Sequence, residues 1–363
     1  MKIVHLITTI CRGGAETQLL TLVRQQIKLG YEVSIYYLKG EPELESDFAS
    51  AGANVIGVLS GRNFLQQIFL IRKNLKGSNS IIHAHLPKSE LIASLAKSDN
   101  QFLISRHNSE LFYPGAPKVV SRFLSKWVSF RSFGCISISN AVKNYLIENR
   151  ELLASRNHWV VEYGFNSNFS TLKYQQKVWS GNQITLGTVA RLVPQKDLPT
   201  LIRGFAVYSA NRNEARLLIV GLGSEEVKLK NLAEVLEISE KVNWVDKTID
   251  VYEVMSEIDI FCLTSKYEGF GLVLLEAMQA EIPIVAANNS AIVEVLGEKY
   301  PFLFRTSDQS DLVEKLEKLS NPQNRDEAIK YLKKRLTFFS PEIMAQKIDA
   351  IYVESLSGTN LGK

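Results

Sequence analysis

The 363-residue sequence has few cysteines and no long apolar run. Its three cysteines, Cys11, Cys135 and Cys262, are far apart and contain no CxxC pair. Such a sparse, odd set excludes a disulfide framework and a cysteine zinc site, and it indicates a reducing compartment. No stretch approaches the roughly 20 apolar residues of a membrane-spanning helix. The apolar N-terminus MKIVHLITTI is predicted to be a first strand and not a signal peptide, so we expect a cytoplasmic protein.

Net charge is low as well. The chain has 42 basic and 38 acidic residues, a balance of +4 that is too mild to indicate a nucleic-acid partner. The charge is unevenly distributed, because residues 1–165 contain 19 Lys and Arg against 12 Asp and Glu, whereas residues 166–363 contain 23 against 26. All five histidines also lie in the first part. The two halves are therefore expected to have different functions.

Short apolar runs alternate with amphipathic helical stretches along the chain. This alternation predicts an α/β fold with parallel sheets that carry helices on both faces. The length favours two domains. We expect one domain over residues 1–165, a polar linker over 166–182, a second domain over 183–340 and a C-terminal helix over 341–363 that returns to the first domain. Ligands should bind in a cleft at the carboxyl ends of the strands.

Glycine pairs follow a predicted strand in each half. Gly13 and Gly14 stand between the first strand and a helix, where backbone N–H groups and the helix N-terminus favour phosphate. Gly221 and Gly223 hold a similar place in the second half. An ordinary tight turn explains both pairs equally well. The absence of GxGxxG makes a dehydrogenase less favoured.

Two cations follow another strand of the second half. Arg191 and Lys196, in VARLVPQKD, lie on a loop at the carboxyl end of that strand. A pair of cations in such a place neutralises a diphosphate, and arginine binds its oxygens in a bidentate manner. From spacing alone, a solvated loop with incidental charges is the simpler interpretation.

The densest motif is EGFGLVLLE, from Glu268 to Glu276. A helix is predicted from Leu272, directly after Gly269 and Gly271. A carboxylate on such a helix accepts hydrogen bonds from the two adjacent hydroxyls of a ribose. Alternatively, Glu276 bonds only nearby backbone. An acidic residue among leucines is costly to bury without partners, and this favours a ligand.

Histidines end two strands of the first half. His83 and His85 end one strand and His107 follows another, all on the carboxyl side. A zinc site needs at least three convergent ligands, and no carboxylate partner is evident, so zinc is the minor interpretation. The placement at strand ends favours a hydrogen bond to ligand for at least one of these rings.

A basic helix is predicted around residues 118–131. Lys118, Arg122 and Lys126 recur every fourth residue on one helix face, and Trp127 lies with other apolar side chains on the other side. Between residues 62 and 131 there are eleven basic and three acidic residues. This pattern is typical of a helix that binds an anionic membrane surface. It is equally typical of an amphipathic helix whose apolar face packs on its own sheet.

The motifs GGAE, HAH, His107, ARLVPQKD, IVGLGS and EGFGLVLLEAM occur here in one order. In this combination the chain resembles the retaining nucleotide-sugar glycosyltransferases of the GT-B architecture, the large glycosyltransferase group 1 family. The resemblance covers nearly the whole chain and is most specific in the second half. It implies two Rossmann-like domains that face a central cleft.

The resemblance also implies roles for individual residues. Arg191 and Lys196 would bind the donor diphosphate, Glu276 the ribose and Glu268 the transferred sugar, while His107 would lie near the reacting carbon. Of these, His107, Glu268, Arg191 and Lys196 would be catalytic. The full donor set that it implies is Gly13, Gly14, Arg191, Lys196, Gly221, Gly223, Glu268, Gly269, Phe270, Gly271, Leu272 and Glu276. No metal and no other cofactor is expected.

The activity that follows is transfer of a hexose or N-acetylhexosamine, with a UDP-sugar as the favoured donor. The expected acceptor is a saccharide or a polyprenyl-diphosphate-linked saccharide of a bacterial cell-surface polysaccharide such as lipopolysaccharide. The enzyme would then work at the cytoplasmic face of the inner membrane. Two other interpretations are a nucleotide-sugar epimerase of similar shape and a nucleotide-binding protein without catalytic activity.

Overall fold

The computed structural model describes the whole chain except residues 98–99, 114, 154–155, 166–182, 247–250 and 358–363. The predicted linker over 166–182 therefore lies outside the described residues. The chain divides into two compact units. Unit 1 contains Met1–Asn166 together with Phe339–Lys363, and unit 2 contains Ser167–Phe338.

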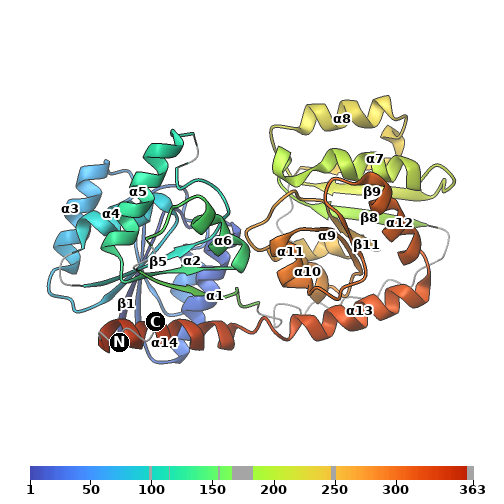
Figure 1. Cartoon of the computed structure of the whole chain (residues 1–363). Coiled ribbons are helices and arrows are strands. Elements are labelled where there is room, and N and C mark those ends of the chain that lie inside the picture. Colours follow the sequence, from blue (N-terminus) through green and yellow to red (C-terminus); the bar gives the residue numbers. More distant parts are fainter. Residues whose placement is uncertain (98–99, 114, 154–155, 166–182, 247–250, 358–363) are drawn as a thin grey trace. The chain divides into compact units, whose positions relative to one another are not determined.

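Unit 1 is built on a parallel sheet with helices on both of its faces (Figure 1). Its described strands have the order β3-β2-β1-β4-β5-β6-β7. They are β1 (Lys2–Ile7), β2 (Glu32–Tyr37), β3 (Asn54–Ile56), β4 (Ile81–His85), β5 (Gln101–Arg106), β6 (Gly134–Ser137) and β7 (Asn157–Val160). The helices are α1 (Gly14–Lys28), α2 (Glu45–Ser50), α3 (Phe64–Leu75), α4 (Pro87–Ala96), α5 (Lys118–Arg131), α6 (Asn140–Glu148) and α14 (Pro341–Ser357).

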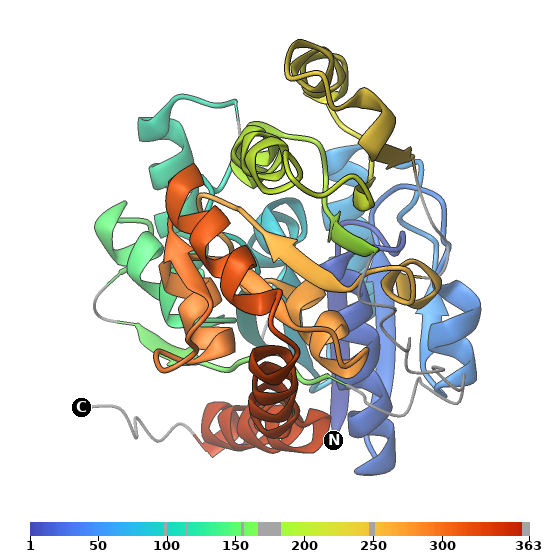
Figure 2. The ribbon, with the colours of Figure 1, turned by 90° about the vertical axis from the view of Figure 1, so that its right-hand side faces the viewer.

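The C-terminal helix α14 belongs to unit 1. It lies against α1 (Figure 1 and Figure 2). Its apolar side chains, among them Met344 and Ile348, join a core cluster with strand residues such as Ile3 and Ile81. The central strands are buried on both faces, and this explains why they read as continuous apolar runs.

Unit 2 repeats the architecture with the strand order β10-β9-β8-β11-β12-β13. Its described strands are β8 (Ile184–Val189), β9 (Ala215–Val220), β10 (Val242–Val245), β11 (Ile260–Leu263), β12 (Ile284–Asn288) and β13 (Leu303–Arg305). Its helices are α7 (Leu198–Tyr208), α8 (Glu226–Val235), α9 (Val251–Met255), α10 (Leu272–Gln279), α11 (Ser290–Leu296), α12 (Gln309–Leu319) and α13 (Pro322–Leu336), with short 3-10 turns η2 (Pro194–Lys196) and η3 (Ser239–Lys241).

The prediction of two Rossmann-like parallel sheets is confirmed, because every strand pairing between described residues is parallel. Local signals are confirmed too. Gly30 follows α1 with a φ of 80°, in the left-handed region where glycine is favoured. The Ser139 side chain caps α6 by accepting a hydrogen bond from the Val142 N–H.

Strand order reverses direction once in each sheet. In unit 1 the reversal falls between β1 and β4, and in unit 2 it falls between β8 and β11. Connections on the two sides of such a point run to opposite faces, and in parallel α/β sheets ligands bind at the carboxyl edge beside this point. Among the described residues, no helix is long and apolar enough to cross a membrane.

Candidate active site

A lysine and a glutamate meet at the strand reversal of unit 2. Lys196 ends the loop after β8, and Glu268 lies on the loop after β11. The Lys196 Nζ is 2.6 Å from the Glu268 Oε1, and the two side chains are only 14% and 8% exposed. The Ser265 hydroxyl donates to the same carboxylate oxygen at 2.6 Å. The structure thus brings together two residues that the sequence places far apart.

Backbone bonds join the two loops that carry this pair. The Lys266 N–H donates to the Gln195 carbonyl at 2.8 Å. The Thr264 hydroxyl donates to the Lys196 carbonyl at 2.8 Å. Because both loops are held to each other, the lysine and the glutamate are fixed before any ligand arrives. Such preorganised charges stabilise a developing anion without a cost of reorganisation.

Arg191 lies on the same loop as Lys196 but is exposed. Within the described part of the chain, no acidic side chain pairs with its guanidinium. A surface arginine beside a buried lysine gives this edge of the sheet two cations, of which one is already neutralised by Glu268. The remaining positive charge suits an anionic ligand.

The helix that follows Glu268 begins after a glycine with a left-handed backbone conformation. Gly271 has a φ of 92° and precedes α10, whose N-terminus has no side-chain cap. The first N–H groups of a helix lack partners within the helix and carry partial positive charge. The start of α10 at Leu272 therefore offers donors close to Glu268, in agreement with the predicted helix boundary.

Glu276 lies one turn into α10, where burial raises the pKa of its carboxyl to about 7. In the described residues, no side chain or backbone group donates a hydrogen bond to this carboxylate. Glu276 is partly exposed, so this carboxyl group is open to hydrogen-bond donors from water or from a ligand. The alternative in which Glu276 only bonds nearby backbone is therefore not what the structure shows.

Gly221 and Gly223 have a purely local explanation in the structure. A Cβ on Gly221 would lie 2.0 Å from the Ala190 carbonyl oxygen, and one on Gly223 would lie 2.2 Å from that of Leu192. The loop after β9 thus packs directly on the loop after β8. These glycines allow the loop that carries Arg191 to pack closely on their own loop. Their predicted contact with the nucleotide-sugar donor stays a prediction.

At the strand reversal of unit 1, a carboxylate that sequence reasoning missed lies beside the glycine turn. The Glu16 side chain is buried and accepts a hydrogen bond from the Thr9 hydroxyl at 2.6 Å. A Cβ on Gly13 would lie 2.6 Å from the Glu16 Oε2. A side chain at position 13 would therefore displace this carboxylate from its present place. The predicted phosphate contact of Gly13 and Gly14 stays a prediction. The negative charge of Glu16 already interacts with the partial positive charge at the N-terminus of α1.

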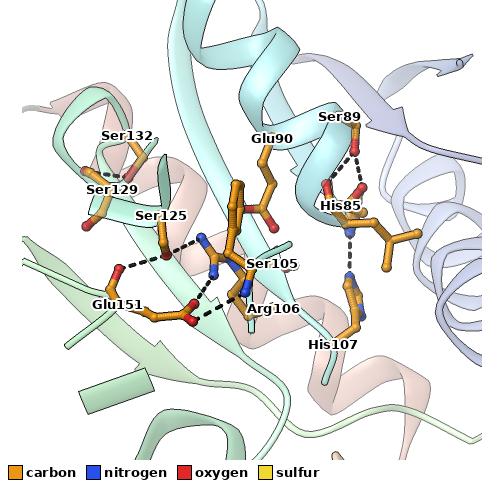
Figure 3. A network of polar contacts seen from close by, with 12 residues as sticks. His85, Ser89, Glu90, Ser105, Arg106, His107, Ser125, Ser129, Ser132 and Glu151 are labelled. Atoms are coloured by element: carbon orange, nitrogen blue, oxygen red, sulfur yellow. Dashed lines mark hydrogen bonds and ion pairs between the residues drawn. The ribbon is translucent and has the colours of Figure 1, made fainter. Parts of the chain in front are cut away.

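His107 is held by hydrogen bonds on both sides of its ring. Its Nε2 is 3.1 Å from the His85 Nδ1 (Figure 3), and its Nδ1 is 2.5 Å from the Tyr163 hydroxyl. Burial, with a smaller effect from Arg106, lowers the pKa of His107 to about 4. The ring is therefore neutral at physiological pH. A sugar hydroxyl reaches a ring nitrogen only by replacing one of these two bonds.

The residue before His107 is buried between two acidic side chains (Figure 3). The Arg106 Nε donates to Glu90 at 2.7 Å, and another nitrogen of the guanidinium lies 3.4 Å from Glu151. A third donates to the Ser125 hydroxyl at 3.1 Å. Arg106 was counted in the basic stretch of the sequence, but at 4% exposure it is a core residue and cannot contribute to a surface.

Helix α5 packs with its serine side inward. Ser121, Ser125 and Ser129 are buried, whereas Phe123 and Trp127 are 68% and 39% exposed. The Ser125 hydroxyl donates to the Glu151 carbonyl at 2.8 Å, so the serines serve the buried polar network. The interpretation in which the apolar side packs on its own sheet is therefore wrong for the aromatic residues.

Two family models match this chain. Residues 170–335 match the model described as "Glycosyl transferases group 1", and residues 12–161 match "Glycosyltransferase Family 4". Together they cover both units.

Relatives and a solved structure agree with these matches. The chain is 35% identical over 157 residues to an uncharacterized glycosyltransferase of Haemophilus influenzae, a match that spans 43% of this chain and only 44% of that protein. It is 26% identical over 359 residues, 93% of this chain and 94% of the other, to a GalNAc-alpha-(1->4)-GalNAc-alpha-(1->3)-diNAcBac-PP-undecaprenol alpha-1,4-N-acetyl-D-galactosaminyltransferase of Campylobacter jejuni. The structure of Anabaena Alr3699/HepE in complex with UDP-glucose superimposes with a TM-score of 0.80 at 19% identity, over 98% of this chain and 100% of that one.

The buried Glu90 makes stability depend on pH. Burial raises the pKa of its carboxyl from 4.5 to about 7, although Arg106 opposes the shift. Between these two values the folded chain binds more protons than the unfolded chain, so this group makes stability fall as pH rises. Replacing Glu90 by Gln removes the effect. Relative to wild type, the free energy of unfolding of Glu90→Gln should therefore rise by roughly 1–3 kcal/mol from about pH 5 to about pH 8.

Calorimetric unfolding across that range measures this difference. Glu148→Gln is the matched control, because Glu148 is an exposed glutamate of the same unit. Its difference from wild type should be independent of pH. A Glu90→Gln difference that is equally flat would contradict the assignment.

Proposed function

The chain belongs to the glycosyl transferases group 1, a family of retaining enzymes with the GT-B fold, and on that premise we propose that it transfers a hexose or N-acetylhexosamine from a nucleoside-diphosphate sugar to a saccharide acceptor. The observation that carries the proposal is the buried Lys196–Glu268 pair at the β8–β11 reversal. A UDP-sugar is the favoured donor, which is supported by the similarity of the fold to Anabaena Alr3699/HepE in complex with UDP-glucose.

The donor is held by unit 2 in this proposal. Arg191 and Lys196 bind the diphosphate, and Glu276 accepts hydrogen bonds from the ribose hydroxyls. Glu268, with the backbone of Gly269 to Leu272, binds the transferred sugar. Two observations support these roles: no described residue donates a hydrogen bond to the Glu276 carboxyl, and the Lys196 ammonium lies 2.6 Å from Glu268.

The reaction requires little covalent chemistry from the protein. As the sugar leaves through an oxocarbenium-like state, negative charge develops on the departing diphosphate, which Arg191 and Lys196 stabilise. The acceptor hydroxyl then attacks the same face of the sugar and gives its proton to the departing phosphate. The bond from the anomeric carbon to the phosphate breaks, and a glycosidic bond of retained configuration forms. In this proposal His107 acts on the transferred sugar.

The acceptor in this proposal is a polyprenyl-diphosphate-linked saccharide at an anionic membrane. The Campylobacter jejuni relative has an undecaprenol-linked substrate in its name. In unit 1, α4 lies between α3 and α5 (Figure 1). Phe69 of α3 and Phe123 of α5 are exposed, as are Arg72, Lys73 and Lys118 near them in sequence. Exposed aromatic side chains together with cations suit the headgroup region of an anionic bilayer.

Lys196→Ala should lower kcat/KM for sugar transfer by roughly 100- to 1000-fold, about 3–4 kcal/mol, because one preorganised charge on the leaving group is lost. Arg191→Ala should have an effect of the same order. The measurement is release of the nucleoside diphosphate together with identification of the glycosylated product. Product analysis also separates transfer from epimerisation of the donor.

The matched control is Lys318→Ala. It removes an exposed lysine of α12 that pairs with Glu314 at 2.7 Å, so it changes the net charge of unit 2 without touching the proposed site. Its turnover should equal that of wild type. Wild-type turnover by both Lys196→Ala and Arg191→Ala would exclude the proposed diphosphate site.

The exposed face of α5 should bind anionic vesicles. Replacing the exposed Lys118 together with the half-buried Arg122 and Lys126 by Gln should weaken binding by up to roughly 100-fold, since each cation near such a surface contributes about 1 kcal/mol. Replacing Phe123 and Trp127 by Ser should weaken binding to anionic and neutral vesicles alike. Vesicle flotation at low salt is the measurement.

Val227→Ser with Val235→Ser is the matched apolar control, because both valines are exposed on α8 of unit 2, at 72% and 80%. Flotation of this variant should equal that of wild type. If the wild-type chain fails to float with anionic vesicles at low salt, the membrane part of the proposal is wrong. If the wild-type chain is a dimer and the Phe123 and Trp127 substitutions dissociate it, this face binds a second copy of the chain instead of a membrane.

A further inference from the structure

Four of the five histidines gather inside unit 1. His5 on β1 stands directly opposite His83 on β4, and Ile7 stands opposite His85, so the three rings project from one face of the sheet. His107, just after β5, joins them through His85. The His5 and His83 side chains are fully buried, and His85 is nearly so. Polar rings in such a place need partners for every nitrogen.

Each of their eight ring nitrogens has a partner. The contacts form a single chain of eight side chains, which are, in order, Tyr163, His107, His85, His5, Gln26, Tyr352, His83 and Ser105. The contact distances along it, in the same order, are 2.5, 3.1, 3.0, 2.9, 3.2, 2.7 and 2.8 Å. Gln26 comes from α1 and Tyr352 from α14, so this histidine chain connects the sheet with the C-terminal helix.

The proton positions along the histidine chain follow from the amide of Gln26. Its oxygen faces the His5 Nε2, so His5 donates there. A neutral imidazole has one donor and one acceptor, so the His5 Nδ1 accepts from His85. Because the His85 Nε2 donates, the His85 Nδ1 must accept, and its donor is the His107 Nε2. The His107 Nδ1 then accepts from the Tyr163 hydroxyl.

The hydrogen bonds on the other side of Gln26, toward Ser105, also require Nε2 to carry the ring proton. The Gln26 amide N–H donates to the Tyr352 oxygen, and the Tyr352 hydroxyl donates to the His83 Nδ1. His83 then donates from its Nε2 to Ser105. All four rings are thus of the same neutral tautomer, protonated at Nε2. A charged ring would carry two donors and would break one of these bonds, which is consistent with the low pKa that burial gives each of them.

Helix α14 also touches the other end of the histidine chain. A cavity of about 30 Å³ is lined by His85, His107 and Tyr163 together with Met344 and Ile348 of α14. The helix is fixed to α1 by a hydrogen bond from Gln25 to Glu342 at 3.0 Å. Docking of α14 therefore acts on His107 through the hydrogen bonds that start at the Tyr352 hydroxyl, and α14 also lines the cavity beside the His107 ring.

We propose that Tyr352, Gln26, His5 and His85 are positioning residues that hold His107 as a single neutral tautomer, so that the docking of α14 sets the protonation state of the His107 ring. The consequence for catalysis rests on the proposed function, in which His107 lies beside the sugar. The tautomer itself does not depend on it.

A metal ion is the competing use of this cluster. One nitrogen from each of His5, His83 and His85 lies within 4.8 Å of the others. Binding an ion would require the ring nitrogens to leave Tyr352 or Ser105 and the His5–His85 bond. Because the existing contacts satisfy all of them, the histidine chain is the better account.

Long-range proton–nitrogen NMR of the full chain with nitrogen-15 histidine tests the proposal. His5, His83, His85 and His107, assigned by single His→Gln variants, should show one shared neutral tautomer from about pH 8 to about pH 5.5. Nε2–H is expected. Zn²⁺ added to wild type should leave these signals unchanged. A mixture of tautomers, a charged ring at pH 7 or stoichiometric Zn²⁺ binding at these nitrogens would overturn the proposal.

Tyr352→Phe removes one hydroxyl and keeps the buried ring. Loss of the hydroxyl removes the partner of the Gln26 amide N–H and frees that amide to turn over. The variant should therefore give His107 a mixture of tautomers and lower kcat three- to tenfold with an unchanged donor KM. Gln26→Leu breaks the neighbouring link and should do the same, which keeps the test valid if one variant folds poorly. An unchanged His107 tautomer in both folded variants would overturn the proposal.

Tyr208→Phe is the matched control. It removes another buried tyrosine hydroxyl, which contacts Ser320 at 2.7 Å in unit 2 and is not part of the histidine chain. Neither the tautomers nor kcat should change. If no transfer is detected while the shared tautomer is present, the proposed function fails and the histidine chain stands.

Discussion

The reversal of strand order in each parallel sheet is the constraint on which the rest of the structure depends. In unit 2 it places the loops after β8 and β11 side by side at the carboxyl edge of the sheet, where hydrogen bonds join them and Lys196 meets Glu268. In unit 1 the reversal lies between β1 and β4, the strands that carry His5, His83 and His85. The residues with the most unusual chemistry in each unit are therefore placed by topology.

Burial of polar groups explains the remaining unusual features. Arg106 lies inside unit 1 with Glu90 and Glu151, and the network needs further hydroxyl partners. Serines of α5 supply them, as Ser125 does for both Arg106 and Glu151. Because the serines must point inward, the aromatic residues of the same helix point to solvent. One buried charge network thus produces the exposed apolar face that we assign to the membrane.

Local sequence signals were enough to predict the fold. Alternating apolar runs and helical patterns predicted two parallel α/β sheets, and the order of motifs identified the family, which the family models confirm. The glycine at position 271 and the helix that starts at Leu272 were readable because backbone conformation depends on a few neighbouring residues.

Pairings across the sheet were not readable in the same way. The link from Gln26 to Tyr352 joins residues 326 positions apart, and no periodicity encodes such a contact. The period of α5 showed two different faces but not which one packs inward, since that choice depends on Arg106 and Glu151. Glu16 was missed as well, because an acidic residue in the first turn of a helix is an ordinary signal there.

The measurement that tests the central claim most directly is calorimetric titration of the purified chain with UDP, GDP and ADP. If the β8–β11 reversal is a nucleotide-sugar site, one of the three should bind with 1:1 stoichiometry. At about 100 times its Kd it should add roughly 2.7 kcal/mol to the free energy of unfolding. Failure of all three nucleoside diphosphates to bind or to stabilise the chain would contradict the account.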